Sequence, residues 1–143
     1  MLYLLAVSSL LAADDAWPQF EVRTGKYVVS ISQAETKRDV YCWGFDPDFE
    51  MPATKIGISI KKEGQTYYPS FSAYSDLSSL HGVAWKMSGD RLIVTGTGGD
   101  AHAGYEVKWT FRNGALVRRE VRAGEFPENE YEITEYVYKP YED

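Results

Sequence analysis

The residue types that most often perform chemistry are sparse in this chain, and their spacing matches no complete motif. Asp46, Asp48 and Glu50 lie two residues apart, as ligands do in a calcium-binding loop. The EF-hand pattern requires glycine at its sixth position and glutamate at its twelfth, where this chain has Met51 and Gly57. The sequence therefore favours an ordinary acidic loop over a calcium site.

A glycine-rich segment from Gly96 to Gly104 carries two polar side chains, Asp100 and His102. It lacks the lysine and hydroxyl ending of a phosphate-binding loop, and no helical pattern follows to supply backbone amides. Two interpretations remain open. The segment is either a plain connector between strands or a lid over a binding site, with Asp100 and His102 as its polar contacts.

Metal and nucleophile chemistry find little support in the sequence. The chain has two histidines, His81 and His102, and one cysteine, Cys42. Catalytic zinc usually takes three protein ligands and structural zinc four, so a site would need distant residues to converge. No Gly-x-Ser-x-Gly motif is present, and no Cys–His signature surrounds Cys42. We expect no metal, no cofactor and no assignable catalytic residue, with Cys42 packed in the core.

Aromatic residues give the stronger indication of function. Eleven Tyr, six Phe and four Trp make up 15% of the chain, and Tyr and Trp suit pockets and interfaces because each has an apolar body and a polar tip. Their strand propensity is the plainer explanation. The residues that we expect to contact a ligand are Trp43, Trp85, Tyr105, Trp109, Asp100 and His102.

The elements that must position these residues are strands. Within 105–112 the apolar residues fall at every second position and polar residues take the other face, which is typical of a half-buried strand. Asn113 and Gly114 then turn the chain back. A two-residue loop would set apolar residues opposite charges, whereas a three-residue loop pairs Val107 with Val121 and Phe111 with Val117. We therefore predict the longer loop, with Gly114 at positive φ.

Similar patterns predict about nine short antiparallel strands and no convincing helix after residue 13. One region, 20–32, reads either as a hairpin or as one long strand with a bulge at Gly25. The expected pairs elsewhere are Ile60 with Tyr67, Ile56 with Phe71, Trp85 with Val94, and Met87 with Leu92. The remaining strands are expected at 40–45, 55–62, 65–71, 83–88, 91–96, 105–112, 116–123 and 131–138. The fold class is all-β: a single antiparallel up-and-down barrel of about eight or nine strands, lipocalin-like in architecture, or alternatively a β-sandwich.

Residues 1–13 form an apolar run ending in small residues, which is typical of a signal peptide. No Lys or Arg precedes the run, and a short apolar helix packed on the domain is the other interpretation. It is too short to span a membrane. We expect one domain over 14–143, secreted or periplasmic. The net charge of −6 argues against nucleic acid, and Arg118, Arg119 and Arg122 are expected on a solvated, salt-bridged face.

These observations favour an exported, non-enzymatic β-barrel domain that binds a small apolar or amphipathic ligand in its interior or mouth. That function requires an inward face, including Trp85, Trp109 and Ile133, that encloses roughly 300–1,000 Å³. The alternative is a protein- or glycan-binding, or inhibitory, module that uses exposed aromatics and has a filled core. A hydrolase or isomerase of unknown type is the second alternative.

Overall fold

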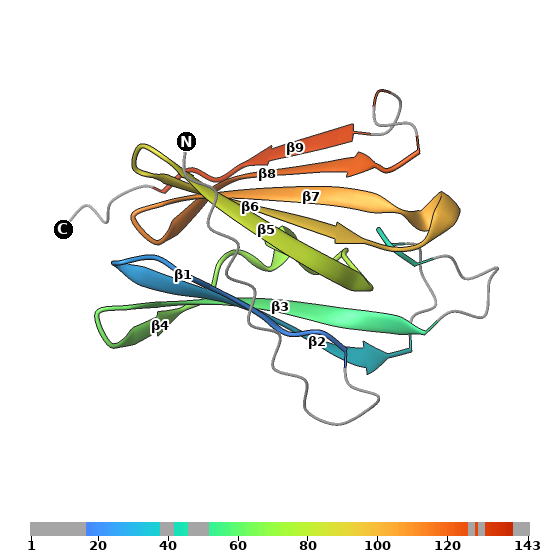
Figure 1. Ribbon diagram of the computed structural model, residues 1–143, viewed down its shortest axis with the longest axis horizontal. Coiled ribbons are helices and arrows are strands. Elements are labelled where there is room, and N and C mark those ends of the chain that lie inside the picture. The colour runs from blue at the N-terminus through green and yellow to red at the C-terminus, as the bar shows by residue number, and fades with distance from the viewer. Residues whose placement is uncertain (1–16, 38–41, 46–51, 126–127, 129–130, 139–143) are drawn as a thin grey trace.

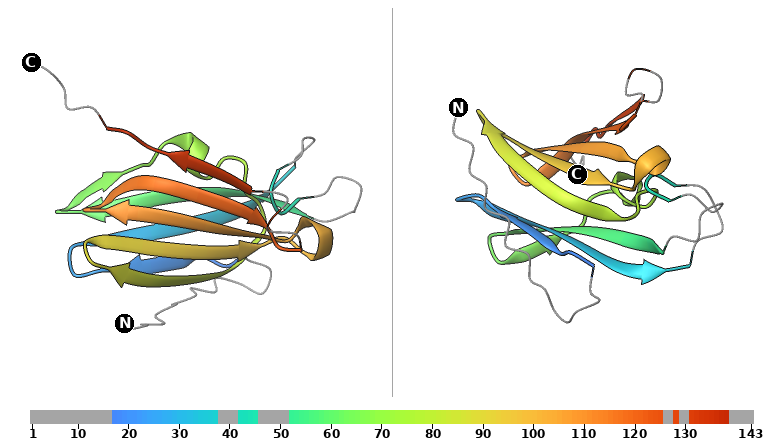
Figure 2. Two further views of the ribbon diagram at one scale, coloured as in Figure 1. Left: turned by 90° about the horizontal axis from the view of Figure 1, so that it is seen from above. Right: turned by 45° about the vertical axis from the view of Figure 1, so that its right-hand side comes forward.

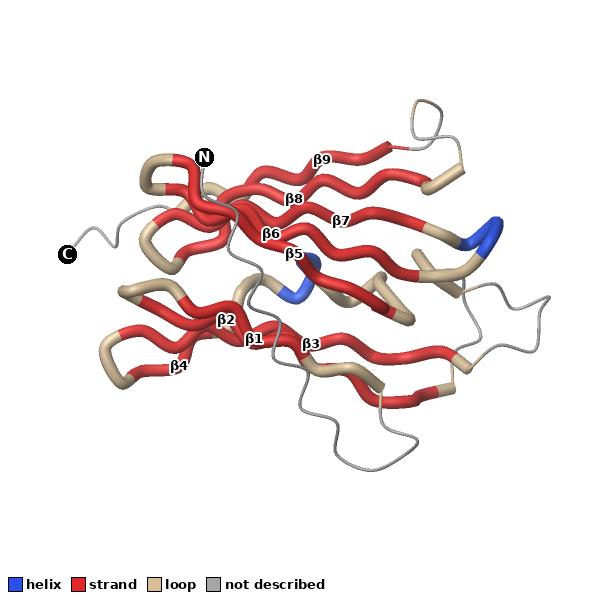
Figure 3. Tube along the Cα trace, in the orientation of Figure 1, coloured by secondary structure: helices blue, strands red, loops and turns tan. Residues whose placement is uncertain are grey.

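The computed structural model describes residues 17–37, 42–45, 52–125, 128 and 131–138. This part of the chain is all-β and forms two antiparallel sheets (Figure 1, Figure 3). The four-stranded sheet has the order β1 (Phe20–Arg23), β2 (Tyr27–Thr36), β3 (Ala53–Lys62), β4 (Gln65–Tyr67). The five-stranded sheet has the order β5 (Leu80–Ser88), β6 (Arg91–Gly98), β7 (Tyr105–Arg112), β8 (Ala115–Ala123), β9 (Tyr131–Glu135). Two short 3₁₀ turns are η1 (Phe71–Ala73) and η2 (Ala101–Ala103).

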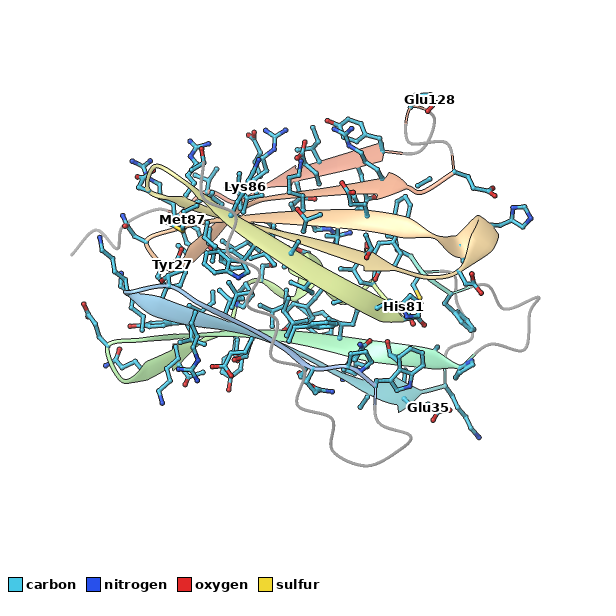
Figure 4. The ribbon with its side chains drawn as sticks, viewed as in Figure 1. Tyr27, Glu35, His81, Lys86, Met87 and Glu128 are labelled. Atoms are coloured by element: carbon cyan, nitrogen blue, oxygen red, sulfur yellow. The ribbon has the colours of Figure 1, made fainter. Side chains whose placement is uncertain are left out.

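The two sheets face each other, and β4 lies along the same edge of the molecule as β9 (Figure 2). Alternate side chains of β1, β2, β3, β5, β6, β7 and β8 point inward and form one apolar core, which Figure 4 shows as side chains meeting between the layers. Among the described residues no hydrogen-bonded strand pair joins the two sheets. The described residues therefore form two antiparallel sheets and no closed barrel.

The β7–β8 hairpin confirms most of the predicted register. Val107 lies opposite Val121, and Gly114 has a φ of 82°. The predicted three-residue loop is wrong, because the turn contains only Asn113 and Gly114, both at positive φ. Such a turn matches the twist of the two strands.

A bulge reconciles this short turn with the predicted register. The pairing shifts between Thr110 and Phe111, so Phe111 lies opposite Leu116 and the predicted pair with Val117 is wrong. Val117 is the extra residue of the bulge. The shift returns the apolar residues of both strands to one face, as burial requires.

Of the two pairs predicted for the β3–β4 hairpin, one is confirmed and one is wrong. Ile60 lies opposite Tyr67, as predicted, but β4 ends there and Phe71 begins η1. The predicted pair of Phe71 with Ile56 is therefore wrong. Pro69 accounts for the early end of β4, because proline has no N–H to continue a ladder.

Elsewhere the β5–β6 hairpin confirms both predicted pairs, Trp85 with Val94 and Met87 with Leu92. Residues 20–32 form the hairpin β1–β2 rather than one bulged strand. The strand predicted over 40–45 is reduced to isolated bridges at Cys42, Trp43 and Phe45. The leader-like run 1–13 and the acidic residues 46–50 lie outside the described residues.

The chain from β4 to β5 passes between the two sheets (Figure 1). We call residues 71–79 the crossing segment. Its first residue, Phe71, is exposed, but Ala73, Leu77 and Ser78 have no exposed surface. An irregular segment with this degree of burial must find hydrogen-bond partners for its backbone.

Candidate functional site

Two of the residues predicted to contact a ligand bind the crossing segment instead. Trp109 is fully buried on β7, and its indole Nε1 donates a hydrogen bond to the carbonyl oxygen of Ala73 at 2.9 Å. The Tyr105 hydroxyl donates to the carbonyl oxygen of Ser78 at 2.8 Å. Both side chains therefore satisfy backbone oxygens that would otherwise be buried without partners.

Burial also fixes the protonation state of Tyr105. Desolvation raises the pKa of its hydroxyl well above the usual value, and electrostatic interactions with Cys42 and Asp76 raise it further. The hydroxyl therefore stays protonated and remains a donor to Ser78.

The other two predicted tryptophans are half-buried against the same core. The Trp43 backbone N–H donates to the Asp76 carbonyl oxygen at 2.8 Å, and its indole Nε1 donates to Glu132 Oε1 at 3.2 Å. Trp85 lies on β5, and its buried Nε1 has no hydrogen-bond partner among the described residues. Trp43 thus links the crossing segment to β9. The indole N–H of Trp85 is a buried donor without a partner among the described residues.

Asp100 and His102 lie at the surface, in the connection between β6 and β7. His102 is exposed, and its Nδ1 lies 3.1 Å from Glu125 Oε2. His81, the second histidine, hydrogen-bonds through Nε2 to the Gly99 carbonyl at 3.0 Å. The structure does not bring Asp100 and His102 to the two grooves described below, and their part in ligand binding stays a prediction.

A charged cluster that the sequence analysis missed lies beside the crossing segment. Arg119 was expected on a solvated face, but its side chain is only 3% exposed. Its guanidinium forms two hydrogen bonds to Asp76, at 2.6 and 2.7 Å, and one to Glu132 at 2.7 Å. It also donates to the carbonyl oxygen of Ser72.

Burial lowers the pKa of Arg119, but the hydrogen bonds to Asp76 and the charges of Asp76 and Glu132 outweigh it and raise the pKa overall. Arg119 is therefore a charged side chain of β8 that binds both β9 and the crossing segment. Its neighbour Arg118 does lie on a salt-bridged face, with Glu120 and Glu135.

Exposed aromatic side chains gather along the edge where β4 lies. We call Tyr67, Tyr68, Phe71 and Tyr138 the aromatic band; they are 48%, 75%, 63% and 59% exposed. The C-terminal segment is held next to η1 and β8, because the Tyr136 hydroxyl lies 3.3 Å from Ser72 Oγ and the Tyr138 hydroxyl donates to Leu116 O. A gathering of large exposed apolar groups on one edge is typical of a binding surface.

Two hollows flank Tyr68. The edge groove, of about 440 Å³, has a floor of small residues on β2 and β3, including Ser32, Gly57 and Ser59. Its aromatic wall is formed by Tyr68, Phe71 and Tyr74. The end groove, of about 300 Å³, lies between the turns of the β3–β4 and β7–β8 hairpins and is lined by Tyr67, Tyr68 and Tyr138.

The chemistry of the edge groove suits binding. Among the described residues that line it, Lys55 is the one charged side chain. Within the described residues no group of three or more His, Cys, Asp or Glu side chains is placed to hold a metal ion. The described part of the chain also contains no helix of the length and apolarity that a membrane crossing requires.

Comparisons of this chain with protein-family models, with curated protein sequences and with solved structures find no significant match. The site is therefore interpreted from its own geometry.

Proposed function

We propose that this chain is an exported, non-enzymatic binding domain that recognises a partner protein through the aromatic band, on a β-sandwich scaffold. The observation that carries the proposal is the exposure of Tyr68 and Phe71, at 75% and 63%, beside a groove of about 440 Å³. Export rests on the leader-like run at residues 1–13.

The filled interior supports a surface site over an interior one. Trp109, Phe111 and Leu77 have no exposed surface, and the crossing segment occupies space between the sheets that an interior ligand would need. Large side chains at these positions leave a packed core.

A protein partner is favoured over a glycan by the chemistry of the exposed groups. Phe71 has no polar tip, and Val137, next to Tyr138, is 84% exposed and aliphatic. Apolar and aromatic side chains without hydrogen-bonding groups suit the apolar centre of a protein interface. A hydroxyl-rich glycan would leave polar groups unpaired against Phe71 and Val137.

The second candidate is a small apolar ligand in the end groove. Its volume of about 300 Å³ lies at the lower end of the range for small-molecule sites. Tyr67 and Tyr138, which line this groove, would contact such a ligand.

Selection of phage-displayed short linear peptides on the immobilised chain tests the proposal. We expect enriched peptides whose affinity falls at least about tenfold on the variant Tyr68→Ala/Phe71→Ala. The matched control is Tyr131→Ala, because Tyr131 is also exposed, at 48%, but lines neither groove. Peptides that bind the double variant as well as the wild type contradict the proposal, as does binding to a glycan array that depends on Phe71.

A further inference from the structure

The outer side of β9, the last strand of the five-stranded sheet, carries no further strand among the described residues. β9 pairs with β8 alone, and Figure 2 shows it at the margin of its sheet. Its residues are accessible: Tyr131 and Ile133 are 48% and 42% exposed, and Glu135 is also exposed. The strand contains neither lysine nor proline, which commonly keep an edge strand from pairing.

A hydrogen bond beyond the end of β9 fixes which of its backbone groups face outward. The Tyr136 N–H donates to Val117 O at 3.0 Å, directly after the pair of Arg118 with Glu135. Hydrogen-bonded pairs alternate along an antiparallel ladder, so every second residue of β9 directs its N–H and C=O to β8 and the others direct them outward. The residues whose backbone groups face outward are Tyr131, Ile133 and Glu135. These groups have no hydrogen-bond partner among the described residues.

A charge on the inner face of an edge strand usually opposes pairing, and Glu132 of β9 points toward the core side. Its carboxylate is already neutralised, because Arg119 donates to Oε1 at 2.7 Å and Trp43 Nε1 donates to the same oxygen at 3.2 Å. Glu132 therefore leaves the outer edge of β9 free to pair.

The order of side chains along β9 is complementary to itself. When two copies of β9 pair antiparallel about Ile133, the two Ile133 side chains meet at the two-fold axis. Tyr131 of each copy then lies opposite Glu135 of the other copy. All three outward-facing residues of each strand take part, and each of these pairs exchanges both of its N–H···O bonds.

Other registers of the same two strands are less favourable. A shift by two residues in one direction sets Glu132 opposite Glu132 of the second copy, and like charges in this position destabilise a ladder. The same shift in the other direction sets Ile133 opposite Glu135 of the second copy, so the apolar contact between the isoleucines is lost. The register about Ile133 has neither fault.

The charges beside β9 favour a second copy of the chain as the partner. The Arg122 guanidinium lies over the Tyr131 ring, 4.9 Å from its centre, so this side chain extends across the outer face toward the free side of β9. In the register about Ile133, the residue directly beyond Tyr131 is Glu135 of the second copy. Arg122 of each copy is therefore directed at a carboxylate of the other, and the two-fold axis makes this contact twice.

We propose that two copies of this chain pair through β9, antiparallel about Ile133, and join their five-stranded sheets into one. The aromatic band lies beside the C-terminal end of β9, where Tyr138 bonds Leu116 O and Tyr136 lies against Ser72. Antiparallel pairing thus places the two bands at opposite ends of the joined strands. The inference goes beyond the proposed function and does not rest on it.

Proline at position 133 tests the backbone pairing. Proline has no N–H, and the N–H of Ile133 does not pair with β8, so Ile133→Pro removes a donor from the proposed interface and none from the β8–β9 ladder. Sedimentation velocity over a concentration series measures the dimer Kd, which we expect to rise at least about tenfold. Far-UV circular dichroism checks that the variant is folded.

The matched control is Met87→Pro, on β5 at the other edge of the same sheet. Met87 is 41% exposed. The two-residue turn at Gly89-Asp90 makes Ser88 and Arg91 a hydrogen-bonded pair, so the N–H of Met87 faces away from β6. This variant should dimerise as the wild type does.

Two charge variants give a test that a loss of folding cannot imitate. Arg122→Glu or Glu135→Arg alone sets like charges at both contacts of the homodimer, and each should dimerise severalfold more weakly than the wild type. Mixed in equal amounts, the two variants form a heterodimer in which both contacts again join opposite charges. Dimerisation should then return to the wild-type level, and native mass spectrometry identifies the heterodimer by its mass.

A chain that stays monomeric at every concentration tested overturns the proposal. So does a dimer that Ile133→Pro leaves intact, or a mixture of the charge variants that dimerises no better than either alone. The variant Tyr68→Ala/Phe71→Ala should dimerise normally, because both residues lie outside β9. Loss of the dimer in that variant would place the interface at the aromatic band and overturn pairing through β9.

Discussion

The indole Nε1 of Trp109 and the carbonyl oxygen of Ala73 form a hydrogen bond of 2.9 Å, and neither residue has exposed surface. Trp109 belongs to the five-stranded sheet and Ala73 to the crossing segment. A buried carbonyl without a partner costs free energy. This bond is therefore one of the contacts that allow irregular backbone to pass through the core.

Replacing Trp109 tests that account. We expect Trp109→Phe to lower the free energy of unfolding by about 2–4 kcal/mol, because Ala73 O loses its partner and the smaller ring leaves a cavity. Urea unfolding followed by far-UV circular dichroism measures the loss. Trp85→Phe is the matched control, since its Nε1 has no hydrogen-bond partner among the described residues. Equal losses in the two variants contradict the role given to the hydrogen bond.

The buried guanidinium of Arg119 gives a second prediction. Arg119→Gln leaves Ser72 O without a charged donor and places Asp76 and Glu132 near each other without a counter-charge. Breaking a buried pair from one side typically costs about 3–5 kcal/mol, and we expect a loss of about 3 kcal/mol because both carboxylates are partly exposed. Arg118→Gln, one residue earlier on the outer face, should cost far less. Chemical denaturation of both variants in the same buffer compares them.

Tyr105 makes stability depend on pH in the alkaline range. Burial raises its pKa in the folded state, whereas an unfolded tyrosine ionises at about pH 10. Above that pH the unfolded chain loses a proton that the folded chain retains, so stability falls as pH rises toward the folded pKa. Tyr105→Phe removes this contribution, and its stability should fall less steeply above about pH 10.

The same variant should be less stable than the wild type at neutral pH, because the Ser78 carbonyl loses its donor. Urea midpoints measured between about pH 8 and 11 give both results. Tyr68→Phe is the control, because Tyr68 is exposed. If the urea midpoints of the wild type and of Tyr105→Phe fall equally steeply with pH, this account is contradicted.

Strand existence and pairing could be predicted from the sequence because alternation is a local signal. The period of two over 105–112 placed Val107 opposite Val121, and the structure agrees. The bulge at Val117 could not be predicted from alternation, because it arises from a conflict between turn geometry at Asn113-Gly114 and burial farther along the hairpin.

The sequence contains no comparable local signal for the buried path of the crossing segment. Residues 71–79 are rich in serine, a composition typical of a surface loop. They are buried because Trp109, Tyr105 and Arg119, all distant in sequence, supply the hydrogen bonds that a buried backbone needs. Arg119 itself was predictable, since the predicted register places it opposite Trp109 on the inward face.

Exposure of aromatic side chains could be predicted from the sequence, but not which of them would be exposed. Exposed aromatics were expected from composition, yet Trp109 and Tyr105 lie inside while Tyr68 and Phe71 lie outside. That exposure follows from the end of β4 at Tyr67, which turns the next residues away from the sheet. Pro69 was the local signal for this end, but the groove also needs η1 and Tyr74 from the following turn.

If the aromatic band serves binding rather than folding, its residues can be replaced without loss of stability. Tyr68→Ser should change the free energy of unfolding by no more than about 0.5 kcal/mol, because Tyr68 is 75% exposed. Tyr74→Ser should cost about 2 kcal/mol, since Tyr74 packs against the core and meets the Phe71 ring edge-on at 5.6 Å. Both residues line the edge groove, so both variants should weaken the selected peptides. Urea unfolding and peptide titration on the same samples separate the two effects, and a large loss of stability in Tyr68→Ser would mean that this side chain is exposed for a structural reason.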